Sequence, residues 1–203
     1  MKAIVEHKIS IMPAVQYIDG YHAPSKVEPL CRACPSYGRC WTCPPFDHDV
    51  MAHLQQFEWV LVLGAKITPD DELRHSPGSA ATRNALAHRL ITQAWLQNVE
   101  PLMRSLESNH PGSTLLCGFF ACPSECSAHC ARIDGKPCRH PQLMRPSLEA
   151  YGFDVAKTTS ELLGLELKWA NDNALPEYTT LVTAIFTHNQ PAIAPAPPVE
   201  LSL

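Results

Sequence analysis

The feature that most constrains this chain is the placement of its cysteines, because eight of the nine lie in two short stretches. One stretch reads CRACPSYGRCWTCPPF and the other reads CPSECSAHCARIDGKPCRHP. Four thiols so close together form one ligand set for one metal centre. The sequence therefore predicts metal binding by two sets of four thiols. The first set is Cys31, Cys34, Cys40 and Cys43, and the second set is Cys122, Cys126, Cys130 and Cys138.

Charge and hydropathy narrow the class of protein. The net charge of -4 argues against a nucleic-acid binder, which needs a basic face. The opening residues MKAIVEHKISIMPAV mix charged with apolar side chains, unlike a signal peptide, and no apolar run is long enough to cross a bilayer. We therefore expect a cytoplasmic protein that binds neither nucleic acid nor membrane. Cytoplasmic thiols stay reduced, so clustered cysteines indicate metal ligands rather than disulfides, and the odd number of cysteines agrees.

Apolar runs and helical spacing predict the secondary structure. A strand is expected at 2–11, an irregular segment at 12–30 and a buried strand at 57–67. Apolar residues at helical spacing predict a long helix from 79 to 109, which Pro101 should kink or split near Glu100. The remaining expected elements are a strand at 114–120, a short helical stretch at 141–164 broken at Gly152, and strands at 165–170 and 177–188.

This order of elements predicts an α/β (α+β) fold, with a small mixed sheet packed by helices on one face. The 203 residues are enough for one domain with a hydrophobic core. We expect a single metal-binding domain over 1–188, with cysteine loops at 31–46 and 117–141 placed at strand ends. The prolines of 189–203 predict a disordered tail.

Thiolates select zinc, copper(I) or iron–sulfur clusters, and the spacing favours the last of these. A zinc ribbon separates its two cysteine pairs by about fifteen to twenty residues, whereas the first set has the spacing C-x2-C-x5-C-x2-C. The second set, C-x3-C-x3-C-x7-C, does not match the ferredoxin pattern. Proline follows Cys34, Cys43 and Cys122, which stiffens the loops and excludes water. We therefore favour one or two [4Fe–4S] clusters, with zinc as the alternative.

Longer strings around these cysteines resemble a known family. They are C-x2-C-x2-Y-G…W-x-C-P-P-F at residues 31–46 and G-x-P-C-R-H-P…R-P-S-x-E-A-x-G-x-D-V…T at residues 135–158. The chain resembles the predicted metal-binding proteins called domain of unknown function 2284, over nearly its whole length. The resemblance implies metal binding. Cys31, Cys34, Cys43, Cys130 and Cys138 match the family strings, Cys122 and Cys126 match them with a shift of one residue, and Cys40 is additional.

The sequence leaves three classes of function open. The first is an iron–sulfur protein that serves electron transfer or redox accessory work with a redox partner protein. A structural-zinc interaction module is the second, and a metal sensor or delivery protein is the third. No phosphate-binding loop and no nucleophile motif is present, so any catalysis belongs to the metal centre, and enzyme activity and oligomeric state stay open.

Three further residues are candidates near these loops. Cys117 lies in the apolar string LLCGFF, which indicates a buried and inert thiol, although it is able to replace a ligand. His48 and His53 follow the first set closely enough to extend that metal site. Isolated histidines near a loop are more often simply exposed, and we expect that here.

Overall fold

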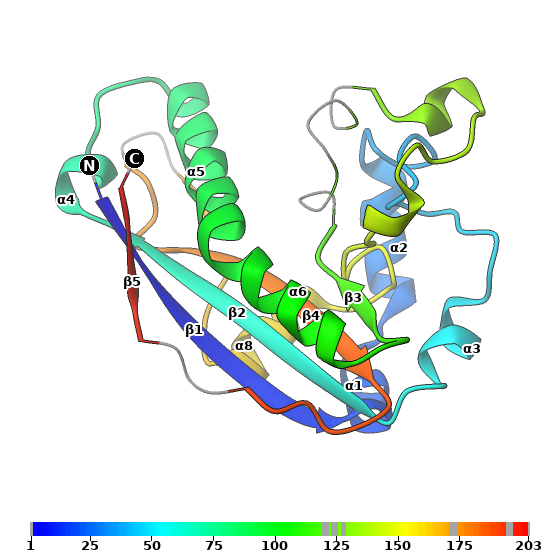
Figure 1. Ribbon diagram of the computed structural model, residues 1–203. Coiled ribbons are helices and arrows are strands. Elements are labelled where there is room, and N and C mark those ends of the chain that lie inside the picture. The colour runs from blue at the N-terminus through cyan, green and yellow to red at the C-terminus, as the bar shows by residue number, and fades with distance from the viewer. Residues whose placement is uncertain are drawn as a thin grey trace.

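The computed structural model describes residues 2–118, 122, 126, 129–170, 174–193 and 197–202. Its centre is a five-stranded sheet in the order β3-β4-β2-β1-β5, in which every neighbouring pair is antiparallel. The expected α+β class is confirmed (Figure 1). The strands are β1 (Lys2–Pro13), β2 (Trp59–Pro69), β3 (Thr114–Leu116), β4 (Thr179–Thr187) and β5 (Val199–Ser202).

The central strand β2 is buried on both faces. Leu61 and Leu63 belong to the hydrophobic core on one face, and Val60 and Val62 belong to the core on the other. Gly64 of the same strand packs so closely under Leu163 that a Cβ there would lie 2.6 Å from a leucine methyl carbon. Helices therefore cover both faces of the sheet, and the expectation of helices on one face is wrong.

The long helix that borders the cysteine loops is continuous in space, but its hydrogen-bonding pattern changes along its length. It begins as α5 (Ala80–Ala94), passes through the π-helical segment η1 (Trp95–Val99) and continues as α6 (Glu100–Asn109). Pro101 is the second residue of α6, and the helix changes from π-helical to α-helical geometry at Glu100 without a break, so the expected split is not observed and only the helix type changes there.

The opposite face carries α1 (Ala14–Tyr21), α3 (Val50–Leu54) and α8 (Val155–Leu163), and Figure 1 shows α1 and α8 on the side of the sheet away from α5. The other helical segments are α2 (Pro24–Ala33), α4 (Asp71–Arg74), and the two short 3-10 turns η3 (Ala131–Asp134) and η4 (Pro141–Leu143).

The segment 12–30, expected to be irregular, contains α1 and α2 instead. Ala14, Tyr17 and Ile18 are buried at helical spacing, and this short stripe is the signal that the prolines obscured. Pro24 occupies the first turn of α2, where proline is compatible with a helix. These two helices matter for function because α2 ends within the first cysteine set.

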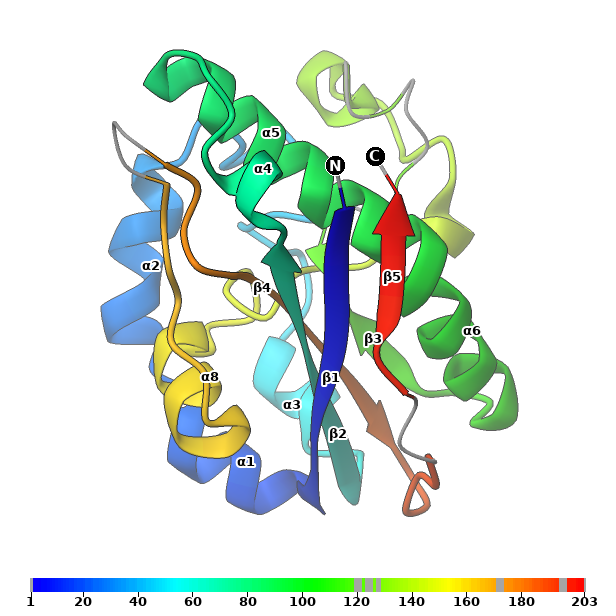
Figure 2. The same cartoon turned by 90° about the vertical axis from the view of Figure 1, so that its left-hand side faces the viewer.

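Two other expectations are also wrong. Residues 165–170 form no strand, because both edges of β4 are already paired, with β2 and β3. Lys168 of this segment forms a 2.6 Å ion pair with Glu177, which lies just before β4. Residues 199–202 of the tail, which we expected to be disordered, form β5 and pair with β1 (Figure 2). Leu201 is buried there, so this apolar side chain stabilises the pairing.

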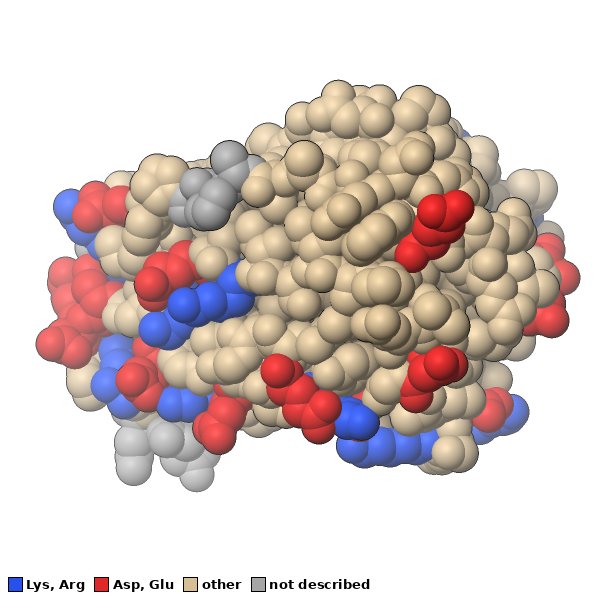
Figure 3. All heavy atoms as spheres, turned by 90° about the horizontal axis from the view of Figure 1, so that it is seen from below, with Lys and Arg blue, Asp and Glu red and all other residues tan. Residues whose placement is uncertain are grey.

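The surface seen from below in Figure 3 carries positive and negative side chains interspersed around a broad uncharged area. No helix within the described ranges is both long enough and apolar enough to span a membrane.

Candidate metal centre

The first cysteine loop begins inside α2 and continues as a series of tight turns. Cys31 lies in the last turn of the helix and Cys34 is its C-terminal cap, with the N–H of Cys34 donating to the carbonyl of Cys31 at 3.0 Å. The next turn is closed by Cys40 N–H donating to Ser36 at 3.2 Å, and the last by Cys43 N–H donating to Cys40 at 3.1 Å. These turns bring the two members of each C-x2-C pair close together.

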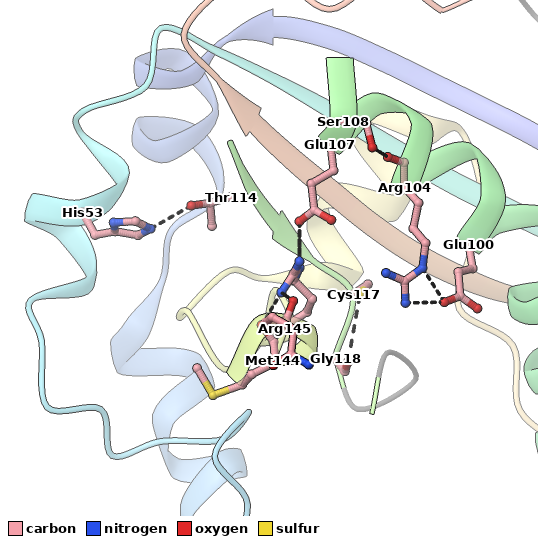
Figure 4. A network of polar contacts seen from close by, with 11 residues as sticks. His53, Glu100, Arg104, Glu107, Ser108, Thr114, Cys117, Gly118, Met144 and Arg145 are labelled. Carbon is pink, nitrogen blue, oxygen red and sulfur yellow. Dashed lines mark hydrogen bonds and ion pairs between the residues drawn. The ribbon is translucent and has the colours of Figure 1, made fainter. Parts of the chain in front are cut away.

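The second cysteine loop leaves the sheet after β3 and returns to it at Pro146. The N–H of Cys117 donates to the carbonyl of Pro146 at 2.9 Å, which closes the base of the loop. Arg145 beside this point forms a 2.8 Å ion pair with Glu107 of α6 (Figure 4). Farther along the loop, Gly135 adopts a left-handed conformation that ends η3 and turns the chain toward Cys138.

A single arginine joins the two cysteine loops. Arg132 of the second loop donates to the carbonyls of Cys40 at 2.9 Å, Cys43 at 2.6 Å and Pro45 at 2.5 Å. Its guanidinium also lies 4.9 Å from the ring centre of Trp41, whose indole N–H donates to the carbonyl of Lys136 at 3.1 Å. Hydrogen bonds from a charged donor are stronger than neutral ones, so the two loops form one structural unit.

The structure brings the second cysteine set together with two cysteines of the first set. All four thiols of the second set line a partly enclosed cavity of about 550 Å³, together with Cys40 and Cys43. Cys130 of the second set also contributes to raising the pKa of Cys40, after the larger effect of burial. Cys31 lies outside this lining and donates to the carbonyl of Glu149 at 3.7 Å, and Cys34 is exposed. The first set is therefore divided between the cavity and the outer surface at the end of α2.

Burial raises the proton affinity of four of the thiols. Burial raises the pKa of Cys43 and of Cys122 to about 11, and it raises the pKa of Cys31 and Cys40 as well. Metal binding must therefore release protons from these thiols. Among the described side chains, no group of three His, Cys, Asp or Glu is arranged to hold a metal ion as it stands. The donor set has the chemistry for a thiolate-bound centre, but its members must converge to bind one.

Cys117 and the two histidines lie apart from the two cysteine sets. Cys117 is buried, with its thiol directed to the carbonyl of Gly118, and burial raises its pKa to about 12 (Figure 4). His53 shares a 2.8 Å hydrogen bond with Thr114, and His48 shares one of 3.2 Å with the hydroxyl of Tyr151. Both histidines belong to an aromatic cluster around Tyr151 rather than to a thiol set.

Sequence reasoning missed two parts of the site. One is Arg132, which is 92 residues away from Cys40 and carries no motif. The other is the wall that α5 and η1 place opposite the thiols. The four residues of this wall are His88, Thr92, Trp95 and Leu96. Trp95 belongs to the apolar stripe that faces the core, and the other three residues lie on the more exposed edge of the helix, so their pattern gave no sign of a shared cavity.

Fold and site together define a class: an α+β protein in which two thiol-rich loops meet beside the long helix. Residues 19–186 match a family described as predicted metal-binding protein, DUF2284. The match covers most of the chain, so this protein belongs to that family, as the resemblance in its cysteine strings indicated. No curated protein and no solved structure matches the chain.

Proposed function

We propose that this protein is a cytoplasmic iron–sulfur protein that serves electron transfer or a redox accessory reaction. The observation that carries the proposal is the meeting of the two cysteine loops, which places six thiols around one cavity. Soft thiolates with so few competing oxygen ligands suit iron–sulfur clusters. Membership in a family of predicted metal-binding proteins supports the coarser statement, that the protein binds metal.

The size of the cavity favours a cluster over single zinc ions. A structural zinc ion sits about 2.3 Å from each of four sulfurs, so a closed zinc site leaves almost no space between its ligands. The thiols of the second set instead line one side of a cavity of about 550 Å³, together with Cys40 and Cys43. A cluster places several metal ions and sulfides between its thiolates and suits such a spacing better.

The exposure of the first set favours electron exchange with a partner protein. Cys34 is exposed, and Cys31 lies beside it at the end of α2. A centre held there lies near the surface, where a redox partner protein can approach it. Cys40 and Cys43 of the first set line the same cavity as the second set, so an electron entering at the surface has a short path between the two sets.

Reduction of the holoprotein tests the redox function. Protein purified without oxygen should lose visible absorbance on adding dithionite, gain an electron paramagnetic resonance signal, and recover on reoxidation, with a midpoint roughly between −700 and +450 mV. The control is the same protein stripped of metal and reloaded with zinc, which has no redox chemistry and should not respond. If the native holoprotein behaves like the zinc-loaded control, the proposed redox function is wrong and the structural-zinc module takes its place.

A further inference from the structure

The cavity between the cysteine loops and the long helix is larger than a metal centre on its thiol side requires. Its volume of about 550 Å³ falls within the range of small-molecule sites, roughly 300–1,000 Å³. A metal bound by thiolates stays within about 2.3 Å of their sulfurs. The thiols occupy the side formed by the two loops, whereas the side formed by α5 and η1 has none. A metal centre held by these thiols therefore leaves the helix side of the cavity free for another ligand.

The helix side has the composition of a ligand site. Trp95 and Leu96 come from η1, Met144 comes from the end of the second loop, and Trp41 comes from the first loop. Trp95 is only 1 % exposed and therefore rigid, while Leu96 is 49 % exposed at the opening. Aromatic and apolar side chains with a few polar groups are typical of small-molecule pockets. The π-helical geometry that begins at Trp95 is also frequent at functional sites.

One permanent charge faces this cavity. Among the described residues that line it, Arg139 is the only Lys, Arg, Asp or Glu. One Nη group of Arg139 donates to the carbonyl of His129, which anchors the side chain at the rim. A guanidinium carries five N–H donors, so an anchored arginine is still able to bind a carboxylate or a phosphate.

We propose that this cavity binds a small organic molecule with a flat apolar body and one anionic group, next to the metal centre of the second set. The body stacks on the indole of Trp41 and packs against Leu96 and Met144, and the anion binds Arg139. The ligand would thus lie beside the thiols that hold that centre. The inference rests on the proposed function for the identity of that centre, but binding itself is measured without any redox reaction.

The test uses anaerobic holoprotein and isothermal titration calorimetry with 1-naphthoate, a flat aromatic carboxylate. Saturable binding with one site is expected, and the neutral analogue 1-naphthalenemethanol should bind about tenfold more weakly because it lacks the charge-assisted hydrogen bond. Leu96→Trp fills the opening of the cavity and should weaken 1-naphthoate binding at least tenfold with iron content unchanged. The control Val15→Trp places the same side chain at a surface position that is 61 % exposed on α1, and it should change neither quantity.

A second variant separates the ligand from the metal. Arg139→Gln should abolish the preference for 1-naphthoate over the alcohol while iron content stays at the wild-type value. If Arg139→Gln lowers iron content as well, the arginine balances thiolate charge and the anion site is wrong. Absence of saturable 1-naphthoate binding, or equal binding by Leu96→Trp, overturns the whole inference. Iron content measured on the same samples distinguishes a failure of this inference from a failure of the proposed function. Purified protein that contains no iron overturns the proposed function, whereas iron-containing protein that does not bind 1-naphthoate overturns only this inference.

Discussion

Replacing all four cysteines of the second set by serine should lower the iron content of the purified protein to about half of the wild-type value. The reason is that each set supplies four thiols, the usual complement of one cluster, so the loss of one set removes one of two centres. Iron and acid-labile sulfide, measured per chain after anaerobic purification, check this. The matched control is Cys117→Ala, which removes a buried thiol outside both sets and should leave the iron content unchanged.

Because Cys40 and Cys43 line the same cavity as the second set, the outcome also tests whether the two sets hold one centre or two. If either quadruple substitution removes nearly all of the iron, the two sets form a single shared centre and the expectation of two is wrong. Single substitutions then show how much Cys40 contributes to iron binding. Since it is additional to the family strings and faces the second set, Cys40→Ser should lose less iron than Cys43→Ser. Equal losses would contradict that ranking.

Removing the metal should open both cysteine loops while the sheet stays folded. The loops contain few buried apolar side chains of their own, so metal supplies most of their folding free energy. Strands β1, β2 and β4 instead pair over long registers within two hydrophobic cores. Hydrogen exchange on chelated protein should therefore speed up by about a hundredfold or more at 31–46 and 129–140.

The control for this experiment lies within the same chain. Amides of β2 and β4 should keep their exchange rates within a few-fold, because their partners do not involve the thiols. The hydrogen bonds of Arg132 predict that both loops open together, since the second loop holds the carbonyls of Cys40 and Cys43. Unchanged protection of both loops after chelation would show that metal does not order them.

The strands with long apolar runs were predictable, because a run such as that of β2 has no other stable environment than the middle of a sheet. The short strand β5 was not, since its single buried leucine follows a proline-rich segment and its pairing with β1 spans nearly the whole chain. Likewise α1 depends on three side chains that pack against the sheet, and tertiary packing rather than local propensity decides such short helices.

In the candidate site, too, local features were predictable from the sequence and contacts between distant segments were not. The cysteine spacing indicates eight candidate ligands, because ligands to one centre are often close in sequence, and this assignment stays a prediction. The relation between the two loops was not predictable, because Arg132 and Trp41 make contacts that no local pattern encodes. The cavity was not predictable either, because the fold alone brings together its helix wall and its thiol wall.

The identity of the metal tests the central claim most directly. The protein should be purified from cells without exposure to oxygen, and its iron, zinc and acid-labile sulfide measured per chain together with the visible spectrum. The proposed function predicts a brown protein with about four iron and four sulfide for each cluster, and one or two clusters per chain. A colourless protein with stoichiometric zinc and no sulfide would contradict it.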